Sequence, residues 1–170
     1  QHIDGAFITE WARRADGGPF SSLAVTNRVV FYAKEPLIAL ALVAGVTERV
    51  RLLTTAIVVP TRETTLLARQ CASIDALSNG RFRLGLGTQV KGHVERRYST
   101  AWTGPPGPRL REYLLCLQAI FRTFQNPRSP SWFEGEHYRF TLMSPFFNPG
   151  PIAHPQLPLY IAAVNTYMAR

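Results

Sequence analysis

A strand, a helix and a second strand follow one another within residues 51–88, and this succession constrains the fold more than any other feature of the chain. Residues 51–59 are a nearly continuous run of Leu, Thr, Ile and Val, typical of a strand buried on both faces of a parallel sheet. Apolar residues then recur at helical spacing, at Leu67, Cys71, Ile74 and Leu77. The pattern predicts a βαβ unit and therefore a parallel α/β fold.

The second strand of this unit ends in glycines. The helix is predicted to stop at Asn79 and Gly80, because glycine readily adopts the left-handed conformation of a helix C-cap. Alternate residues of the strand are expected to face the core, namely Phe82, Leu84 and Leu86. Gly85 and Gly87 lie near its carboxyl end, where α/β folds bind ligands, and they leave room for a ligand to approach the backbone.

Other elements are predicted before this unit. Residues 4–9 (DGAFIT) are expected to form a short strand that ends at Glu10. Residues 11–33 contain a predicted loop (WARRADGGPF) and strand-like residues (NRVVFYA) without a clear partner. A helix is predicted to start at Pro36 and to end at Gly45 or shortly after it.

After the unit, one long helix alternates with irregular segments. Residues 88–108 are predicted to form a long functional loop. The next helix is expected to start at Pro108 and to pack through Leu110, Leu114, Leu117, Phe121 and Phe124. Residues 126–158 hold seven of the 13 prolines, so we expect an excursion with only short regular structure, such as a small strand over residues 136–140. Residues 159–164 form a further predicted strand that ends at Asn165.

Composition bounds the class of protein. The 170 residues, 46% of them hydrophobic, suffice for a single domain with a substantial core. We predict that Cys71 and Cys116, both on apolar helix stripes, are free buried thiols and not a disulfide or metal ligands. No apolar run reaches the roughly 18 residues of a membrane span, and no signal peptide is apparent, so a cytosolic protein is expected. Because the chain does not begin with Met, we expect it to be part of a longer protein.

The net charge of +8 is concentrated in one segment. Residues 81–122 hold eight Lys or Arg against two Glu. This basic segment suits an anionic ligand such as a phosphate-bearing cofactor, or else it is an ordinary solvated surface. Nucleic-acid binding is a rival interpretation, but no helix-turn-helix, zinc-finger or aromatic RNA-binding motif accompanies the charge, so no nucleic-acid partner is expected.

Several segments together resemble one family, the luciferase-like flavin or deazaflavin oxidoreductases, which includes bacterial luciferase and enzymes that use coenzyme F420. They are, in order, PLIALALVAGVTERVRLLTTAIVVP, LLARQCASIDALSNGRFRLGLGT, REYLLCLQAIF with FEGEHYRF, and HPQLPLYIAAV. The stretches TQVKGHVERRYSTAW and FTLMSPFFNPGPI are similar to the subgroup described as F420-dependent.

This resemblance implies a (β/α)8 TIM barrel, present here only in part. Residues 4–9, 50–59, 81–88 and 159–165 would be its strands two to five, so that strand one and strands six to eight are missing. Residues 1–170 would then form a single incomplete luciferase-like domain with the proline-rich excursion inside it. The segment 11–33 departs from the family in its length.

The resemblance also implies where a cofactor lies. It places a cis peptide bond that does not precede proline, with a bulge, between Ala56 and Ile57, beneath the cofactor ring. It implies further cofactor contacts after the fourth and fifth barrel strands, at Gly87, Thr88, Gln89, Ala162, Ala163 and Asn165.

No catalytic acid or base is assigned from the sequence. Some deazaflavin members carry a glutamate after the glycine turn, and the corresponding position here is Val90. Glu95 and His93 lie nearby and could stand in for it. No metal is expected, since the spacing of His137 and His154 does not suit metal ligands.

The predicted function is hydride transfer between a deazaflavin, coenzyme F420, and a small organic substrate. The first alternative is an FMN-dependent monooxygenase that uses oxygen. An alternative of another class is a non-catalytic fragment or structural subunit, because half a barrel leaves open sheet edges. No membrane partner is expected, and the full-length protein could form a homodimer.

Overall fold

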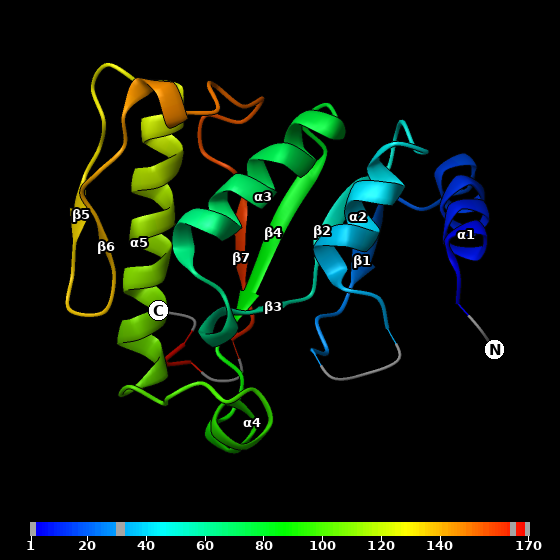
Figure 1. The fold of residues 1–170 in the computed structure, drawn as a ribbon. Helices are drawn as coiled ribbons and strands as arrows, with labels where there is room; N and C mark the ends of the chain where they lie inside the picture. The colour runs from blue at the N-terminus through cyan, green and yellow to red at the C-terminus, as the bar shows by residue number, and fades with distance from the viewer. Residues whose placement is uncertain (1–2, 30–32, 164–165, 169–170) are drawn as a thin grey trace.

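A parallel sheet with helices packed on one face forms the centre of the molecule (Figure 1). The computed structural model describes residues 3–29, 33–163 and 166–168. The strands pair in the order β1-β2-β4-β3, and β7 also pairs with β4. Their bounds are Ser22–Val25 for β1, Arg51–Thr54 for β2, Ile57–Val58 for β3, Phe82–Gly87 for β4 and Leu159–Ile161 for β7. Every pairing among them is parallel, which confirms the predicted α/β class.

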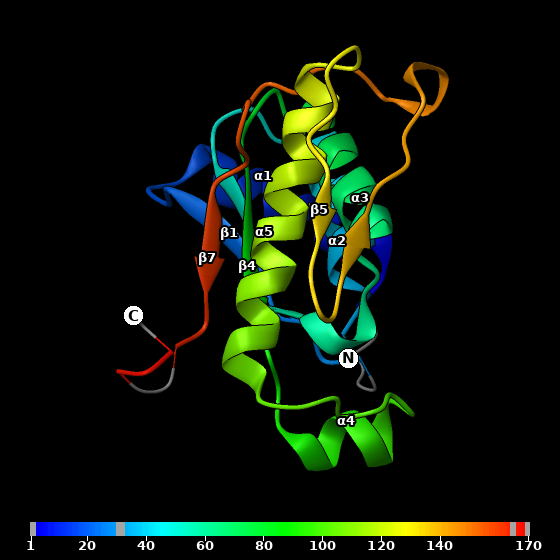
Figure 2. The same cartoon turned by 90° about the vertical axis from the view of Figure 1, so that its left-hand side faces the viewer.

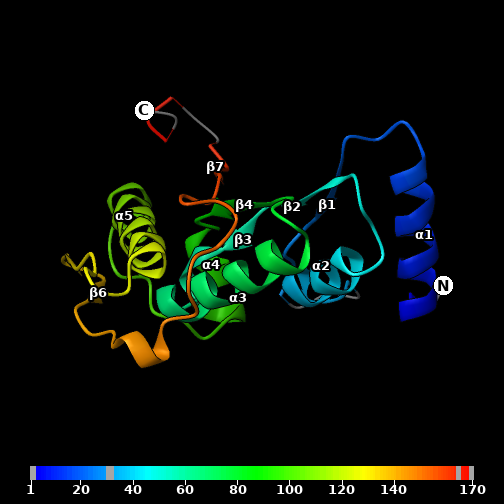
Figure 3. The ribbon, with the colours of Figure 1, turned by 90° about the horizontal axis from the view of Figure 1, so that it is seen from above.

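The helices on the sheet are α2 (Pro36–Ala44), α3 (Thr64–Leu77) and α5 (Pro106–Gln125). Figure 3 shows α2 and α3 on the same side of the sheet, with α5 beyond α3. The predicted start at Pro36 and end at Gly45 are confirmed for α2, whereas α5 begins two residues before the predicted Pro108. Among the described residues, no helix is long and apolar enough to cross a membrane.

The predicted core positions of β4 are confirmed. Phe82, Leu84 and Leu86 have no exposed surface, and they pack in one cluster with Leu67, Cys71 and Ile74 of α3. Leu77, which was predicted to share this stripe, is 59% exposed because α3 ends there. The turn that follows uses left-handed backbone at both Asn79 (φ 51°) and Gly80 (φ 80°), as the predicted helix stop requires.

Both cysteines are free and buried, as predicted. Burial raises the pKa of the Cys71 thiol, and burial likewise raises that of Cys116. The protonated thiols therefore act as small apolar groups of the core.

The predicted strand over residues 4–9 is wrong, because these residues begin a helix, α1 (Gly5–Gly17). The Asp4 carboxylate caps this helix by accepting a hydrogen bond from the Phe7 amide at 2.8 Å. Small residues, Ala12 and Ala15, face the core, whereas Trp11 is 51% exposed. The predicted loop after residue 10 is therefore helical up to Gly17, and β1 supplies the strand that had been placed at residues 4–9.

Two further predictions in the first half need correction. The single strand expected over residues 51–59 is divided into β2 and β3, and a 3-10 helix (Val59–Thr61) follows directly. The strand-like residues 27–33 form no strand at residues 27–29 or 33, and residues 30–32 lie outside the described part of the chain.

A helix also interrupts the long loop expected over residues 88–108. This helix, α4 (Lys91–Arg97), buries Val94. The excursion after α5 contains a small antiparallel hairpin of β5 (Phe133–Glu134) and β6 (Arg139–Phe140) and a 3-10 helix (Pro145–Phe147), so little regular structure forms there, as expected. Figure 2 shows this hairpin and β7 on opposite sides of α5.

Candidate functional site

The carboxyl ends of the strands meet at the edge of the sheet toward which the β4 arrow points in Figure 1, beside α4 and the start of α5. The sequence places its candidate ligand residues at this edge.

Gly85 is held by the neighbouring strand and is not open to a ligand, which corrects the expectation for this residue. A Cβ atom at Gly85 would lie 2.0 Å from the carbonyl oxygen of Thr54. The buried Thr54 hydroxyl accepts a hydrogen bond from the Gly85 amide at 2.8 Å and donates one to the Gly85 carbonyl at 2.9 Å. Glycine is therefore required here so that β2 and β4 can approach each other.

The non-proline cis peptide bond is present, one residue earlier than expected. It joins Thr55 to Ala56, and not Ala56 to Ile57. It lies between β2 and β3, where the chain turns onto the carboxyl edge of the sheet.

Three of the small residues assigned to the cofactor meet at one point. A Cβ atom added to Gly87 would lie 3.6 Å from the Cβ of Ala56 and 3.5 Å from the Cβ of Ala162. Pairing of Val58 with Gly87 aligns β3, and a hydrogen bond of 2.8 Å from the Ala162 amide to the Leu86 carbonyl aligns the end of β7. We call Ala56, Gly87 and Ala162 the small-residue floor.

The other residues of these strands that were predicted to contact the cofactor differ in their exposure to solvent. Ile57 has no exposed surface, and it packs in the core. Ala163 is exposed just beyond the floor. Asn165 lies outside the described residues.

Thr88 and Gln89 follow the floor in a turn that Gln89 stabilises. Gln89 has left-handed backbone (φ 59°), and its Oε1 accepts a hydrogen bond from the Val90 amide at 3.1 Å. The same oxygen lies 3.2 Å from Nδ1 of His93. The Gln89 side chain therefore shapes the turn into α4 and orients the His93 ring.

The two candidates for acid or base chemistry lie on α4. His93 is partly buried next to Gln89, whereas Glu95 is exposed, and its carboxylate lies 3.9 Å from Nζ of Lys91. The side chain of Val90 is 56% exposed and supplies no proton-transfer group.

Two of the basic residues predicted to suit an anionic ligand lie at the opposite end of β4. The Arg81 guanidinium donates to the carbonyl oxygens of Ala44, Thr47 and Val50 at 2.7–3.2 Å, and burial lowers its pKa. Arg83 lies 3.5 Å from Nε2 of His154. These arginines join segments of the fold, so this part of the basic segment is structural.

A sequence profile described as "Luciferase-like monooxygenase" matches residues 2–170 of the chain. The chain belongs to the luciferase-like monooxygenase family. An uncharacterized protein of Mycobacterium tuberculosis is 37% identical over 172 residues, which cover 98% of this chain and 49% of that protein. The chain thus spans about half the length of the curated relatives that it matches.

Solved structures support the same fold. The coenzyme F420-dependent tetrahydromethanopterin reductase from Methanopyrus kandleri is 17% identical, with a TM-score of 0.79 over 98% of this chain and 49% of that one. The oxygenating constituent of 3,6-diketocamphane monooxygenase from Pseudomonas putida, solved with FMN, is 17% identical, with a TM-score of 0.71 over 92% of this chain and 46% of that one. The described sheet and helices are therefore a half-length part of the TIM barrel of luciferase-like enzymes.

A small pocket beside the small-residue floor was not predicted from the sequence. Thr88 lines the pocket together with residues of the 3-10 helix after β3, of the segment after α4 and of the first turn of α5, among them Val59, Pro60, Trp102, Arg109 and Leu110. Two features of the sequence could have indicated this pocket. One is an aromatic residue, Trp102, in a segment rich in Gly and Pro, and the other is a cation, Arg109, directly after Pro108.

The proline-rich excursion is attached to α5 close to this pocket. The Glu112 carboxylate accepts hydrogen bonds from the amides of Glu136 at 3.1 Å and His137 at 2.9 Å. Both hydrogen bonds lower the pKa of Glu112, and the one from His137 has the larger effect. Ligand atoms of these three residues lie within 4.8 Å of one another, but the carboxylate is already engaged by the two amides. The cluster holds the hairpin onto α5.

Proposed function

We propose that this chain forms the cofactor-binding half of an oxidoreductase that uses coenzyme F420 to transfer a hydride to or from a small organic substrate. The small-residue floor is the observation that carries the proposal. Three adjacent strands bring Ala56, Gly87 and Ala162 together, and no side chain of the three extends beyond Cβ. A flat ring can lie on such a surface.

The fit can be tested at Gly87. A Cβ atom there would make only ordinary van der Waals contacts with the protein, so packing within the sheet does not require glycine at this position. Because packing does not require glycine at this edge, the presence of glycine supports a close approach of a ligand to the backbone. At Gly85, two residues earlier, packing does require glycine, because an added Cβ atom would lie 2.0 Å from the carbonyl oxygen of Thr54.

The choice of F420 rests on the residues after β4. The stretch at residues 88–102 is similar to the F420-dependent subgroup, and the reductase from Methanopyrus kandleri shares the fold. FMN is the alternative, with oxygen as the second substrate, because the Pseudomonas putida protein with the same fold was solved with FMN.

The chain's own residues would bind and orient the ring. The floor supplies van der Waals contact, Thr88 offers a hydroxyl beside it, and Gln89 fixes the turn that carries both Thr88 and His93. When bound, the deazaflavin supplies the carbon that takes or gives the hydride. Proton transfer is assigned to no residue, since Val90 occupies the position of the glutamate found in some members.

Absorption spectroscopy tests the proposal. F420 and FMN are added separately to the full-length protein, and the spectrum of each bound cofactor is recorded after removal of the free cofactor. We expect F420 to bind with a perturbed spectrum. Binding of FMN alone would favour the oxygen-using alternative, and binding of neither to the folded protein would refute both and leave the non-catalytic alternative.

We further propose that the full-length protein forms a homodimer. All nine residues of α2 are apolar, yet its Ile38 is 70% exposed and its Leu42 40% exposed. A helix that is apolar on every side is normally covered. Sedimentation should show a dimer that Ile38→Glu dissociates, and a wild-type monomer would contradict this proposal.

A further inference from the structure

We propose that His93 accepts a hydrogen bond from the cofactor that lies on the small-residue floor, and that Gln89 positions its ring for this contact. The accepting atom is Nε2 of the imidazole. The donor is an N–H of the cofactor ring or a hydroxyl of the chain attached to that ring. The inference rests on the proposed function for the identity of the ligand, and it makes α4 part of the cofactor site.

The side-chain oxygen of Gln89 is identified by its backbone partner. Its Oε1 lies 3.1 Å from the amide nitrogen of Val90, and a backbone amide can only donate. The atom that faces this amide is therefore the carbonyl oxygen of the side chain and not its amino group. An amide oxygen accepts hydrogen bonds and donates none.

The same oxygen fixes the tautomer of His93. Nδ1 of the imidazole lies 3.2 Å from Oε1 of Gln89. Because this oxygen only accepts, Nδ1 must carry the proton of the hydrogen bond. In the neutral ring Nε2 is then the unprotonated nitrogen, and it can only accept.

Nε2 of His93 is available to a ligand. Within the described ranges, no group of the protein is hydrogen-bonded to this atom, and the residue is partly buried. The charged neighbours on the same helix, Lys91 and Glu95, are exposed and lie 3.9 Å apart, from Nζ to the carboxylate. An acceptor without a partner in the protein is satisfied by water or by a ligand that donates.

The backbone of Gln89 indicates that its side chain has a task. The residue is left-handed (φ 59°), a conformation that glycine adopts more easily than any residue with a side chain. Glycine here would relieve the backbone but would remove the oxygen that holds Nδ1 of His93. Strained residues of this kind cluster at ligand sites, where the surrounding contacts maintain them.

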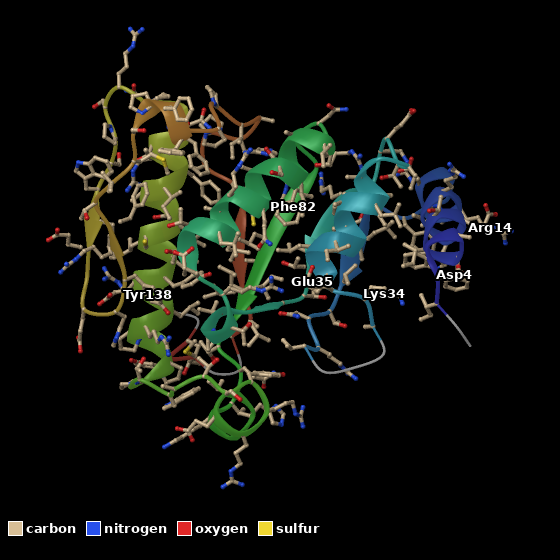
Figure 4. The ribbon with its side chains drawn as sticks, in the orientation of Figure 1. Asp4, Arg14, Lys34, Glu35, Phe82 and Tyr138 are labelled. Atoms are coloured by element: carbon tan, nitrogen blue, oxygen red, sulfur yellow. The ribbon has the colours of Figure 1, made fainter. Side chains whose placement is uncertain are left out.

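The His93 ring lies at the same edge of the sheet as the floor. Gln89 is the second residue after Gly87, so their Cα atoms are at most about 7 Å apart. Figures 1 and 2 show α4 directly beyond the carboxyl end of β4. In Figure 4 the labelled Phe82 belongs to the start of β4, and the side chains of α4 lie beyond the opposite end of the strand.

The chemistry of the cofactor suits an acceptor at this edge. Flavin and deazaflavin rings carry an N–H in their pyrimidine part, flanked by carbonyl groups, and both F420 and FMN carry hydroxyls on the chain attached to the ring. A neutral imidazole that presents Nε2 pairs with these donors and not with the carbonyls. The contact therefore fits either cofactor and orients the ring by its donor side.

Nitrogen NMR of the imidazole groups tests the inference on the full-length protein. Histidine is labelled with 15N, and spectra are recorded at about pH 8, above the ordinary titration range of histidine. They are taken without ligand, with F420, with FMN, and with a deazaflavin ring that lacks the hydroxyl chain. The signal that disappears in His93→Leu belongs to His93. His154, whose Nδ1 lies 3.0 Å from Asp75 near the other end of β4, is the internal reference.

We expect protonated Nδ1 and unprotonated Nε2 in His93 of the free protein. Bound cofactor should move the Nε2 signal to that of a hydrogen-bonded acceptor and leave His154 unchanged. A shift with the ring alone identifies the ring N–H as donor, and a shift with only the complete cofactors identifies a hydroxyl. If a cofactor binds and the Nε2 signal does not move, the inference is overturned and the proposed function stands. If the folded protein binds neither F420 nor FMN, the proposed function fails and the inference fails with it.

Variants of Gln89 test its positioning role. Gln89→Gly keeps the left-handed backbone and removes the oxygen, so both tautomers of His93 should appear, whereas Gln89→Glu keeps an acceptor and should keep the wild-type tautomer. His93→Leu and Gln89→Gly should weaken cofactor binding about threefold to tenfold, the effect of one neutral hydrogen bond. His137→Leu is the matched control, because it removes a partly buried imidazole outside the candidate site, and it should bind as wild type. A single wild-type tautomer in Gln89→Gly would overturn the positioning role.

Discussion

Two glycines separated by one residue in β4 should respond in opposite ways to the same substitution. In Gly85→Ala the new Cβ would lie 2.0 Å from the Thr54 carbonyl oxygen, so β2 and β4 must separate. In Gly87→Ala the nearest heavy atoms are the Cβ atoms of Ala162 at 3.5 Å and Ala56 at 3.6 Å. The first methyl has no space, and the second occupies the small-residue floor.

The magnitudes follow from these contacts. Overpacking at Gly85 costs about 1–3 kcal/mol, and the separation also weakens two hydrogen bonds with the Thr54 hydroxyl worth about 1 kcal/mol each. We expect a loss of about 3–5 kcal/mol in the free energy of unfolding. Gly87→Ala should stay within about 1 kcal/mol of wild type, on the stabilising side, because alanine restricts the unfolded chain.

Urea unfolding followed by circular dichroism measures both changes. The same two variants are titrated with F420, and we expect Gly87→Ala, folded as wild type, to bind more weakly. Equal stability of the two variants would refute the assignment of Gly85 to strand packing. Unchanged F420 binding by Gly87→Ala would refute the assignment of Gly87 to the ligand floor.

Three further predictions concern the anchors of the fold. Asp16→Ala should cost about 1–2 kcal/mol and speed amide exchange in α1, because its carboxylate accepts hydrogen bonds from the amides of Glu48, Arg49 and Val50 at 2.8–2.9 Å. Arg81→Lys should lower the free energy of urea unfolding by about 1–3 kcal/mol, since a single ammonium cannot reach the carbonyls that the guanidinium joins. The pKa of Glu112 lies below its ordinary value of 4.5, so its stabilisation is present above that pH and is lost as the pH falls through the lowered value. The stability difference between wild type and Glu112→Gln, measured by urea unfolding from pH 7 to pH 3, should therefore shrink at the acidic end, and a constant difference would contradict this explanation.

The local patterns of β4 and α3 were readable because they repeat over several residues. Phe82, Leu84 and Leu86 alternate, and Leu67, Cys71 and Ile74 keep helical spacing, so each set reaches one buried face. Such periodicity reports the face that meets the core, whatever the partner element.

The amino-terminal helix was not predicted. Two of its large apolar residues, Phe7 and Trp11, are about half exposed, whereas Ile8 packs against the core beside the buried Ala12 and Ala15. The anchor that holds the end of α1, Asp16, contacts residues more than 30 positions away in the chain. Tertiary contacts of this kind leave no local signal. The Asp4 cap and the helical spacing of Ile8, Ala12 and Ala15 are local signals, and the strand predicted over residues 4–9 overlooked them.

The candidate site was also only partly predictable from the sequence. The meeting of Ala56, Gly87 and Ala162 followed from the family resemblance, which places three strand ends side by side. The pairing of Arg109 with Tyr138, through a hydrogen bond from Nε to the phenol oxygen, spans 29 residues and depends on a short hairpin, of which the sequence predicted only one strand, over residues 136–140.

The central claim is that the small-residue floor carries the ring of the cofactor. The most direct test is F420 titration, followed by absorption, of the full-length protein as wild type and as Gly87→Val, with urea unfolding of both as the control for folding. We predict that the wild type binds F420 and that the folded variant does not, because the valine methyl groups fill the surface between Ala56 and Ala162. Equal F420 binding by the wild type and the folded Gly87→Val variant would contradict the account.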